Sequence, residues 1–124
     1  MPLLVSVDPS RRVVISRGWG SVSDDDLIHG REQLQKDPAF DQSFDRIWDL
    51  SGATSLDLSQ ELLHEFAATS LSLERVQRAI VCVAPRVAER VLDFVSECRK
   101  FHRDVLLFPT QDQAADWMGL NQRG

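Results

Sequence analysis

Four hydroxyl side chains stand between an apolar run and the start of the helix expected after it: Ser51, Thr54, Ser55 and Ser59. Free backbone N–H groups at the start of a helix attract anions, including a phosphoryl group on a local serine. Ser59, with Asp57 two residues earlier, is therefore a candidate phosphate acceptor, and the whole segment is a candidate loop for partner contacts. The simpler interpretation, which we favour, is that Ser59 or Asp57 is only the N-cap of that helix.

The cysteines and histidines form no pattern typical of catalysis or metal binding. Cys82 lies within an apolar run and not after it, unlike the thiol of a phosphatase loop, so we interpret it as a buried, inert thiol. Cys98 lies on the apolar side of a predicted helix and is interpreted as core. We predict no catalytic residue, no cofactor and no metal site, because the three histidines lack partners at metal-ligand spacing: His29, His64 and His102.

One local basic run interrupts a chain that is otherwise acidic. It consists of Arg99, Lys100, His102 and Arg103. Such a run is typical of the solvated end of a helix, where cations also interact favourably with the helix dipole. An anion or phosphate site is the alternative, and we favour the solvated helix end.

The tryptophans suggest where a pocket could form. Trp48, in the middle of a predicted strand, is expected in the core, and Trp117 with Met118 is expected to dock the last helix onto the sheet. Trp19 lies between two glycines at a strand end and could line a shallow pocket or an interface. One hypothesis is therefore a small apolar ligand held between a helix and the sheet, near Trp19 and Trp48.

Length and composition favour a single domain spanning residues 1–124. The chain is 43% hydrophobic and 27% charged, which is typical of a globular protein, and its net charge of −5 argues against nucleic-acid binding. It has no apolar stretch long enough to cross a bilayer, no signal-peptide pattern and no disulfide framework. We therefore expect a soluble cytoplasmic protein.

Hydrophobic periodicity predicts an α/β fold that opens with a hairpin and then alternates helices and strands. Ser23 is expected to cap the first helix, and Gly30 to permit close packing of that helix on the sheet. A five-stranded mixed sheet with about four helices follows from this order. The predicted strands are 3–7, 12–17, 46–50, 78–83 and 105–108, the predicted helices are 24–36, 59–70, 86–102 and 111–118, and 51–58 is a predicted loop.

Three stretches of sequence carry a resemblance to a known group: residues 18–27 (GWGSVSDDDL), 44–52 (FDRIWDLSG) and 114–118 (AADWM). They resemble the SpoIIAA-like branch of the STAS-like proteins, small bacterial α/β domains that are mostly uncharacterised and include an anti-sigma-factor antagonist. In phosphorylated antagonists the acceptor lies at the start of the second helix. The resemblance places Ser59 at that position, although Gln60 follows it where those proteins usually have a small residue.

From the residues and the resemblance together we expect a non-enzymatic regulatory or partner-binding domain. Its partner would contact residues 51–59 and the second helix. The alternative is a domain that binds a small apolar ligand or a lipid. A homodimer is also possible, because the edge strands of a sheet are usually covered.

Overall fold

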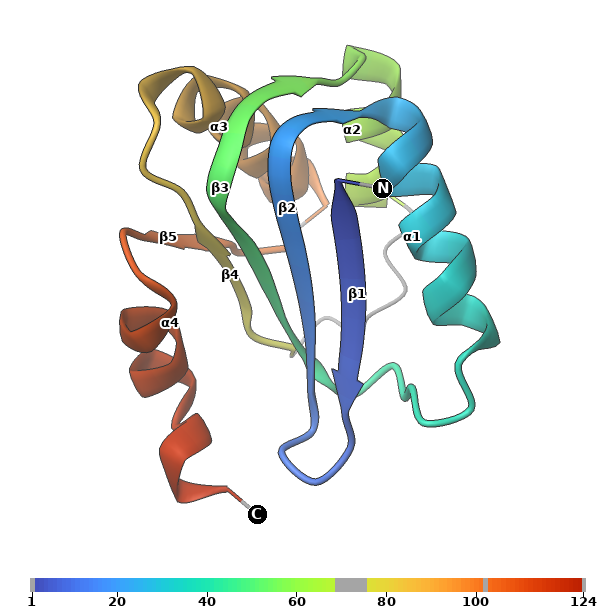
Figure 1. Cartoon of the computed structure of the whole chain (residues 1–124), viewed down its shortest axis with the longest axis vertical. Coiled ribbons are helices and arrows are strands. Elements are labelled where there is room, and N and C mark those ends of the chain that lie inside the picture. The colour runs from blue at the N-terminus through green and yellow to red at the C-terminus, as the bar shows by residue number, and fades with distance from the viewer. Residues whose placement is uncertain (1, 69–75, 102, 124) are drawn as a thin grey trace.

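Five strands form one mixed sheet in the order β1-β2-β3-β4-β5 (Figure 1). This computed structural model describes residues 2–68, 76–101 and 103–123. The strands are β1 (Leu3–Asp8), β2 (Val13–Ser23), β3 (Asp45–Asp57), β4 (Arg78–Val81) and β5 (Leu106–Phe108). The β1–β2 pair is antiparallel and the other pairs are parallel. The predicted α/β fold with a five-stranded mixed sheet is confirmed.

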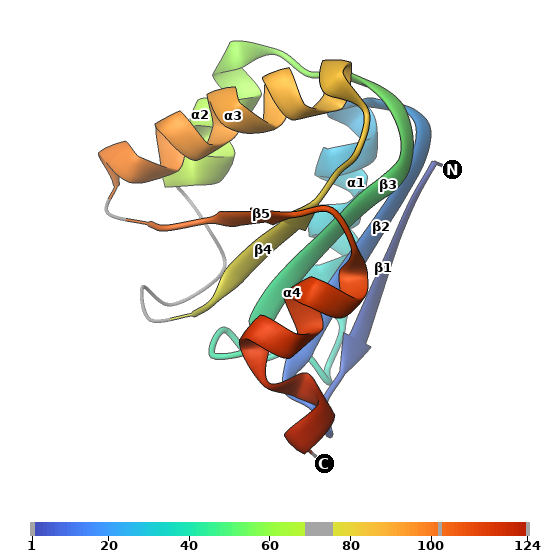
Figure 2. The same cartoon turned by 90° about the vertical axis from the view of Figure 1, so that its left-hand side faces the viewer.

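Helices cover both faces of this sheet (Figures 1 and 2). Three of them, α1 (Asp24–Lys36), α2 (Gln60–Ala68) and α3 (Pro85–Lys100), pack on one face, which we call the three-helix face. The fourth, α4 (Gln111–Met118), packs on the other and is followed by the 3-10 turn η1 (Leu120–Gln122). None of the helices described is both long and apolar enough to cross a lipid bilayer.

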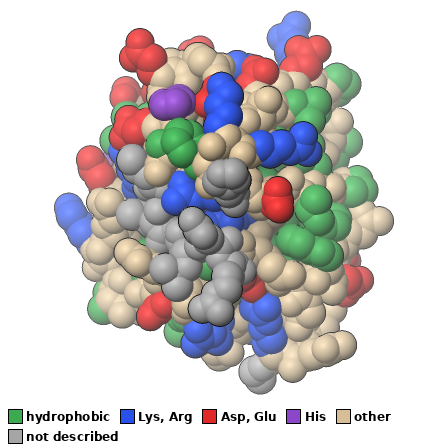
Figure 3. All heavy atoms as spheres, turned by 180° about the vertical axis from the view of Figure 1, so that it is seen from behind, with side chains coloured by type: hydrophobic (Ala, Val, Ile, Leu, Met, Phe, Trp, Pro, Cys, Tyr) green, Lys and Arg blue, Asp and Glu red, His purple; other side chains and the backbone are tan. Residues whose placement is uncertain are grey.

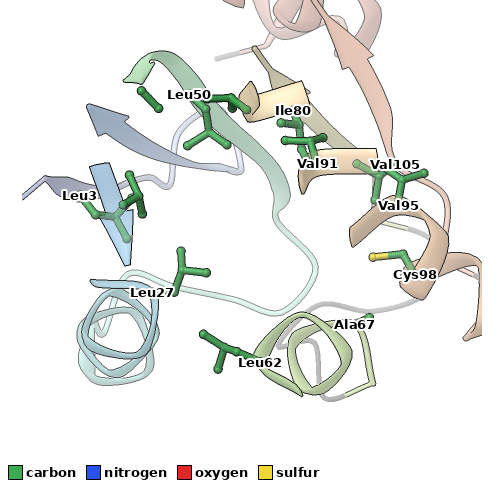
Figure 4. Close-up of a cluster of buried hydrophobic side chains, with 13 residues drawn as sticks. Leu3, Leu27, Leu50, Leu62, Ala67, Ile80, Val91, Val95, Cys98 and Val105 are labelled. Atoms are coloured by element: carbon green, nitrogen blue, oxygen red, sulfur yellow. The ribbon is translucent and has the colours of Figure 1, made fainter. Parts of the chain in front are cut away.

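Alternation along β3 decides which side chains reach each helix layer. Ile47 packs in the cluster beneath α4, whereas Trp48 and Leu50 pack in the larger cluster of the three-helix face. In that larger cluster Leu50 and Ile80 of the sheet meet buried side chains from all three helices, including Leu27, Leu62 and Val91 (Figure 4). Burial of these apolar side chains holds the helices against the sheet.

Helix α1 begins at the predicted cap. The Ser23 hydroxyl accepts a hydrogen bond from the Asp26 N–H at 3.4 Å, and the Asp26 carboxylate accepts one from the Ser23 N–H at 2.9 Å. This reciprocal pair is a capping box. Further along, a Cβ on Gly30 would lie 2.8 Å from Cδ2 of Leu3, so the glycine permits the close packing that we predicted.

The predicted loop over residues 51–58 is wrong, because β3 continues to Asp57. The preceding strand is also longer than predicted: β2 extends to Ser23, and its second half gives residues 52–57 a parallel partner, ending with the pair of Ser23 and Asp57. Two register shifts in the β2–β3 pairing accompany this extension, and at each of them β3 advances by one residue more than β2. The hydroxyls and Gly52 resemble a loop in sequence, but backbone pairing with β2 determines their conformation.

Other element boundaries differ by a few residues. The second helix begins at Gln60, one residue later than predicted, and its predicted end at Ser70 lies outside the described residues. The third helix runs from Pro85 to Lys100, and the predicted end at His102 also lies outside them. The fourth helix has the predicted bounds.

Arg123 connects three parts of the chain that are far apart in sequence, at the end of the sheet where β3 starts. Its guanidinium donates to a carboxylate oxygen of Asp45 at 2.7 Å, to the carbonyl of Arg11 at 3.1 Å and to the carbonyl of Met118 at 2.9 Å. Asp45 also accepts from the Gln77 N–H at 2.9 Å. The start of β3, the β1–β2 turn and the end of α4 are therefore held together by one side chain.

Candidate functional site

Two adjoining pockets lie between the sheet and the three helices. The apolar pocket has a volume of about 50 Å³, and its walls include Leu27, Leu58 and Leu63. The arginine pocket has a volume of about 70 Å³ and is lined by four arginines among apolar side chains: Arg31, Arg46, Arg78 and Arg103. The same four side chains contribute to both pockets, namely Trp48, Phe66, Ile80 and Phe94. The two pockets therefore lie next to each other, and we call them together the groove, with an apolar end and a basic end.

Strand phase explains the basic end of the groove. Arg46 and Trp48 are two residues apart in β3, as are Arg78 and Ile80 in β4, so all four side chains face the three helices. Arg46 and Arg78 are also register partners, as are Trp48 and Ile80. The parallel register therefore places two arginines side by side, next to the aromatic and aliphatic floor of the groove.

The Arg46 guanidinium has an unusual environment for a cation. It lies 4.9 Å from the centre of the Phe40 ring, and its Nε and Nη2 atoms are buried without a hydrogen-bond partner in the described chain. Burial, together with repulsion from Arg78, lowers the pKa of Arg46 to about 10. Arg78 is only 7% exposed and donates to the carbonyl of Val76 at 3.0 Å. Burial also lowers the pKa of Arg78.

Arg31 and Arg103 flank this pair. Arg31 forms an ion pair with Glu65 at 3.0 Å and lies 4.6 Å from the centre of the Phe66 ring. Arg103 donates through Nη1 to the carbonyl of Ala67, while its Nε atom is buried without a partner in the described chain. Figure 3 views the molecule from the side of the three helices, where basic side chains gather near the centre.

The prediction that the basic run is the solvated end of a helix is therefore only partly correct. Arg99 and Lys100 are exposed at the end of α3, and His102 lies outside the described residues. Arg103 instead turns towards the groove, because its N–H donates to the carbonyl of Cys98 at 3.0 Å and brings the chain back over the helix end. Arg103 therefore departs from the predicted solvated helix end.

The structure separates the two tryptophans that we placed near one pocket. Trp48 lines both pockets of the groove. Trp19 is 44% exposed beside Gly52, and it lines neither pocket. The expected docking of the last helix does occur, since Met118 is buried and the Trp117 ring lies 5.5 Å from the ring of Phe108.

The hydroxyl-bearing segment does not form a compact loop. Ser51 donates to Asp49 at 2.6 Å, and Ser55 donates to the hydroxyl of Ser21 at 3.0 Å. Thr54 and Asp57 are exposed on the same extended strand. Ser51 and Asp57 are six residues apart, which in a strand corresponds to roughly 20 Å. These residues therefore follow one strand and do not converge on a single point.

Ser59 lies at the start of α2, as the N-cap interpretation requires. Its hydroxyl accepts a hydrogen bond from the Leu62 N–H at 3.1 Å. Its own N–H donates to the Asp24 carboxylate at 2.9 Å, which connects the starts of α1 and α2. The residue is exposed, with Asp57 and Glu61 close to it in sequence.

Both thiols are disfavoured as nucleophiles. Cys98 is 2% exposed and lines the arginine pocket, and burial raises the pKa of its thiol to about 11. Burial also raises the pKa of Cys82, which is half-buried. A raised pKa reduces the thiolate that would attack a substrate.

The contribution of Arg46 and Arg78 to the groove was not predicted from the sequence. Each begins a predicted strand, in phase with the large side chain two residues later. Two strands joined by a crossover helix are expected to be parallel, and this rule combined with the shared phase could have placed the arginines on one face. Phe66 and Phe94, on the predicted second and third helices, also line the groove.

The comparisons with known proteins concern the fold. No family model matches the sequence, and no curated protein matches it closely enough to count as a relative. The structure is similar to that of an uncharacterised protein of the DUF3478 family with a SpoIIAA-like fold, from Shewanella loihica PV-4. The match has a TM-score of 0.60 and 14% sequence identity, and it covers 93% of this chain and 92% of that chain. The chain has a SpoIIAA-like fold. The resemblance found in the sequence is confirmed at the level of the fold.

Proposed function

We propose that this SpoIIAA-like chain is a non-enzymatic binding domain whose groove holds a small ligand with an apolar part. The observation that carries the proposal is that the two pockets adjoin: Trp48, Phe66 and Phe94 line both, and most of the side chains around the two pockets are apolar. Concave apolar sites with a few polar groups are typical of small-molecule binding.

The side chains of the groove support binding more than catalysis. Cys98 lines the arginine pocket and is a potential nucleophile there. Its thiol pKa of about 11 disfavours attack on a substrate at neutral pH. Neither a histidine nor a carboxylate is among the described residues that line the two pockets. The proposal includes a cytoplasmic location, which the two free thiols support because a reducing compartment keeps them unpaired.

A neutral apolar probe tests this proposal. We expect N-phenyl-1-naphthylamine to bind the wild-type protein and to become more fluorescent, and we expect 1-decanol to displace it. Leu58→Trp adds bulk inside the apolar pocket and should weaken probe binding at least about tenfold. Leu92→Trp places the same side chain at an exposed position of α3 outside both pockets and should leave binding unchanged.

Circular dichroism and thermal unfolding serve as the check that both variants are folded. Native mass spectrometry of freshly purified protein adds a second measurement, since a ligand retained through purification appears as an additional mass. Equal probe affinity in wild type and Leu58→Trp would overturn the proposal.

The start of α2 is a second candidate, as a regulatory surface for a protein partner. Ser59 is exposed there, and its backbone N–H already bonds to the carboxylate of Asp24. A phosphoryl group on Ser59 would add about −1.5 to −2 charge next to Asp24, Asp57 and Glu61. Repulsion would then oppose the docking of an acidic partner at α2 and at the strand that carries Ser51, Thr54 and Ser55.

Charge and capping at Ser59 can be separated by two variants. Ser59→Asp adds charge and Ser59→Asn does not, while both side chains can cap the helix. Quantitative co-precipitation from an extract of the source organism should recover a partner with wild type and Ser59→Asn, and less of the same partner with Ser59→Asp. Equal recovery by all three proteins would remove Ser59 from the regulatory hypothesis.

A further inference from the structure

Two arginines at the basic end of the groove, Arg46 and Arg103, have buried guanidinium nitrogens without a hydrogen-bond partner in the described chain. Arg31 has Glu65 as an ion-pair partner. Arg46 has no carboxylate partner in the described chain, and two of its three guanidinium nitrogens are buried without a hydrogen bond. The Nε atom of Arg103 is in the same condition.

Such an arrangement is costly for the protein alone. Neighbouring strands are about 4.8 Å apart, so Arg46 and Arg78 emerge from the sheet side by side and repel each other. Buried guanidinium groups also lose their hydration, and each N–H left without a partner adds to that cost. The lowered pKa of Arg46 has these same two causes, burial and the charge of Arg78. An anion placed among these donors would remove both penalties.

The walls of the adjoining apolar pocket indicate the chemical character of the rest of the ligand. The arginine pocket adjoins the apolar pocket, because Trp48 and Phe94 are among the side chains that line both. The walls of that second pocket include Val22, Leu27 and Leu63, which offer contacts to a hydrocarbon chain. A ligand that satisfies both ends carries an anionic head on an apolar chain.

We propose that the arginine pocket binds the anionic head group of an amphipathic ligand, with Arg46 and Arg103 as its principal hydrogen-bond donors and the apolar chain in the adjoining pocket. The head is a carboxylate or a phosphate monoester, because guanidinium groups recognise the planar or tetrahedral oxygens of both through paired N–H donors. This inference rests on the proposed function and adds the charge and polarity of the ligand to it.

Isothermal titration with four probes separates the parts of this proposal. Decanoate and decyl phosphate carry the two head groups on one chain, 1-decanol carries the chain alone, and inorganic phosphate carries a head alone. We expect the wild-type protein to bind at least one of the anionic amphiphiles at least about tenfold more tightly than 1-decanol or inorganic phosphate. The preferred amphiphile distinguishes a carboxylate from a phosphate head.

Substitution of Arg46 tests the place of the head group. Arg46→Gln should weaken binding of the preferred amphiphile at least about tenfold and change the affinity for 1-decanol less than twofold. Arg103→Gln provides a second variant at the edge of the pocket, with the same expected direction. Arg99→Gln is the matched control, because Arg99 is exposed, lies on α3 and does not line the pocket.

The outcomes distinguish this inference from the proposed function. If 1-decanol binds as tightly as both amphiphiles, or if neither Arg46→Gln nor Arg103→Gln weakens amphiphile binding, the head-group site is wrong and the apolar groove stands. If inorganic phosphate binds as tightly as decyl phosphate, the site holds a free anion and the amphipathic ligand is wrong. If no probe with a chain binds the wild-type protein, both proposals are wrong.

Discussion

The carboxylate of Glu97 lies 2.9 Å from Nδ1 of His64, and this contact joins α3 to α2. The Glu97 side chain is only 8% exposed, and it also receives the Lys100 ammonium and the Gln60 amide, each at 3.0 Å. Hydrogen bonds from His64 and Lys100 lower the pKa of Glu97 from 4.5 to about 2. Because α2 and α3 form two walls of the groove, this cluster also fixes the distance between those walls.

The depressed pKa of Glu97 predicts a pH dependence of stability. A carboxyl whose folded pKa lies below its unfolded pKa stabilises the fold fully above the unfolded value, here about 4.5, and loses this effect as the pH falls towards about 2. We therefore expect Glu97→Gln to be less stable than wild type at neutral pH. The difference should shrink between pH 4.5 and 2.

Urea unfolding across this pH range measures the difference. Glu89→Gln, at an exposed position of the same helix, is the matched control and should show no such convergence with wild type. A difference between wild type and Glu97→Gln that stays constant down to pH 2 would contradict the prediction.

Removal of the Arg46 charge should stabilise the ligand-free protein. Arg46→Met retains a long side chain beside Phe40 and Trp48 and eliminates the two buried nitrogens without partners. We expect the free energy of unfolding to rise by about 1 kcal/mol, because an apolar side chain replaces a poorly compensated buried cation. Arg86→Met, at the exposed start of α3, should change it by less than about 0.5 kcal/mol. A clear loss of stability in Arg46→Met alone would show that the cation is compensated within the fold.

The cap of α2 should contribute measurable stability. Ser59→Ala leaves the Leu62 N–H without its acceptor and should lower the free energy of unfolding by about 1 kcal/mol. Ser59→Asn retains an acceptor and should recover most of this loss. Chemical denaturation of the three proteins measures both effects, and identical stability of wild type and Ser59→Ala would rule out the cap.

The two thiols should differ in their reaction with iodoacetamide. Cys98 is 2% exposed and has a thiol pKa of about 11, so at pH near 8 it should react at least about tenfold more slowly than half-buried Cys82. Mass spectrometry of Cys82→Ser and Cys98→Ser follows each thiol separately. A ligand in the groove should slow Cys98 further and leave Cys82 unaffected, because Cys98 lines the arginine pocket and Cys82 lines neither pocket. Equal rates for the two thiols would contradict this assignment.

The sequence predicts the fold well where apolar periodicity and end signals agree. Helix α4 has its predicted bounds because Thr110 caps one end and Gly119, with a φ of 71°, terminates the other. Prediction fails in the second half of β3, where Gly52 and the hydroxyls indicate a loop and long-range pairing with β2 imposes a strand. No local pattern encodes the length of a partner strand that lies about thirty residues earlier.

The candidate site was harder to predict than the fold. Trp48 was recognised because a tryptophan in a strand indicates a large buried surface. Arg46 and Arg78 were not, because a charged residue at the start of a strand usually indicates solvent. Their proximity depends on the register of β3 and β4, which sequence periodicity alone does not determine.

The contacts of Arg123 have a consequence for synthesis of the protein. The β1–β2 turn and the start of β3 are made early, yet the side chain that joins them to α4 belongs to residue 123. This corner can therefore close only after residue 123 has left the ribosome. Until then Asp45 lacks its ion pair with Arg123, and chaperones and proteases can reach this corner of the nascent domain.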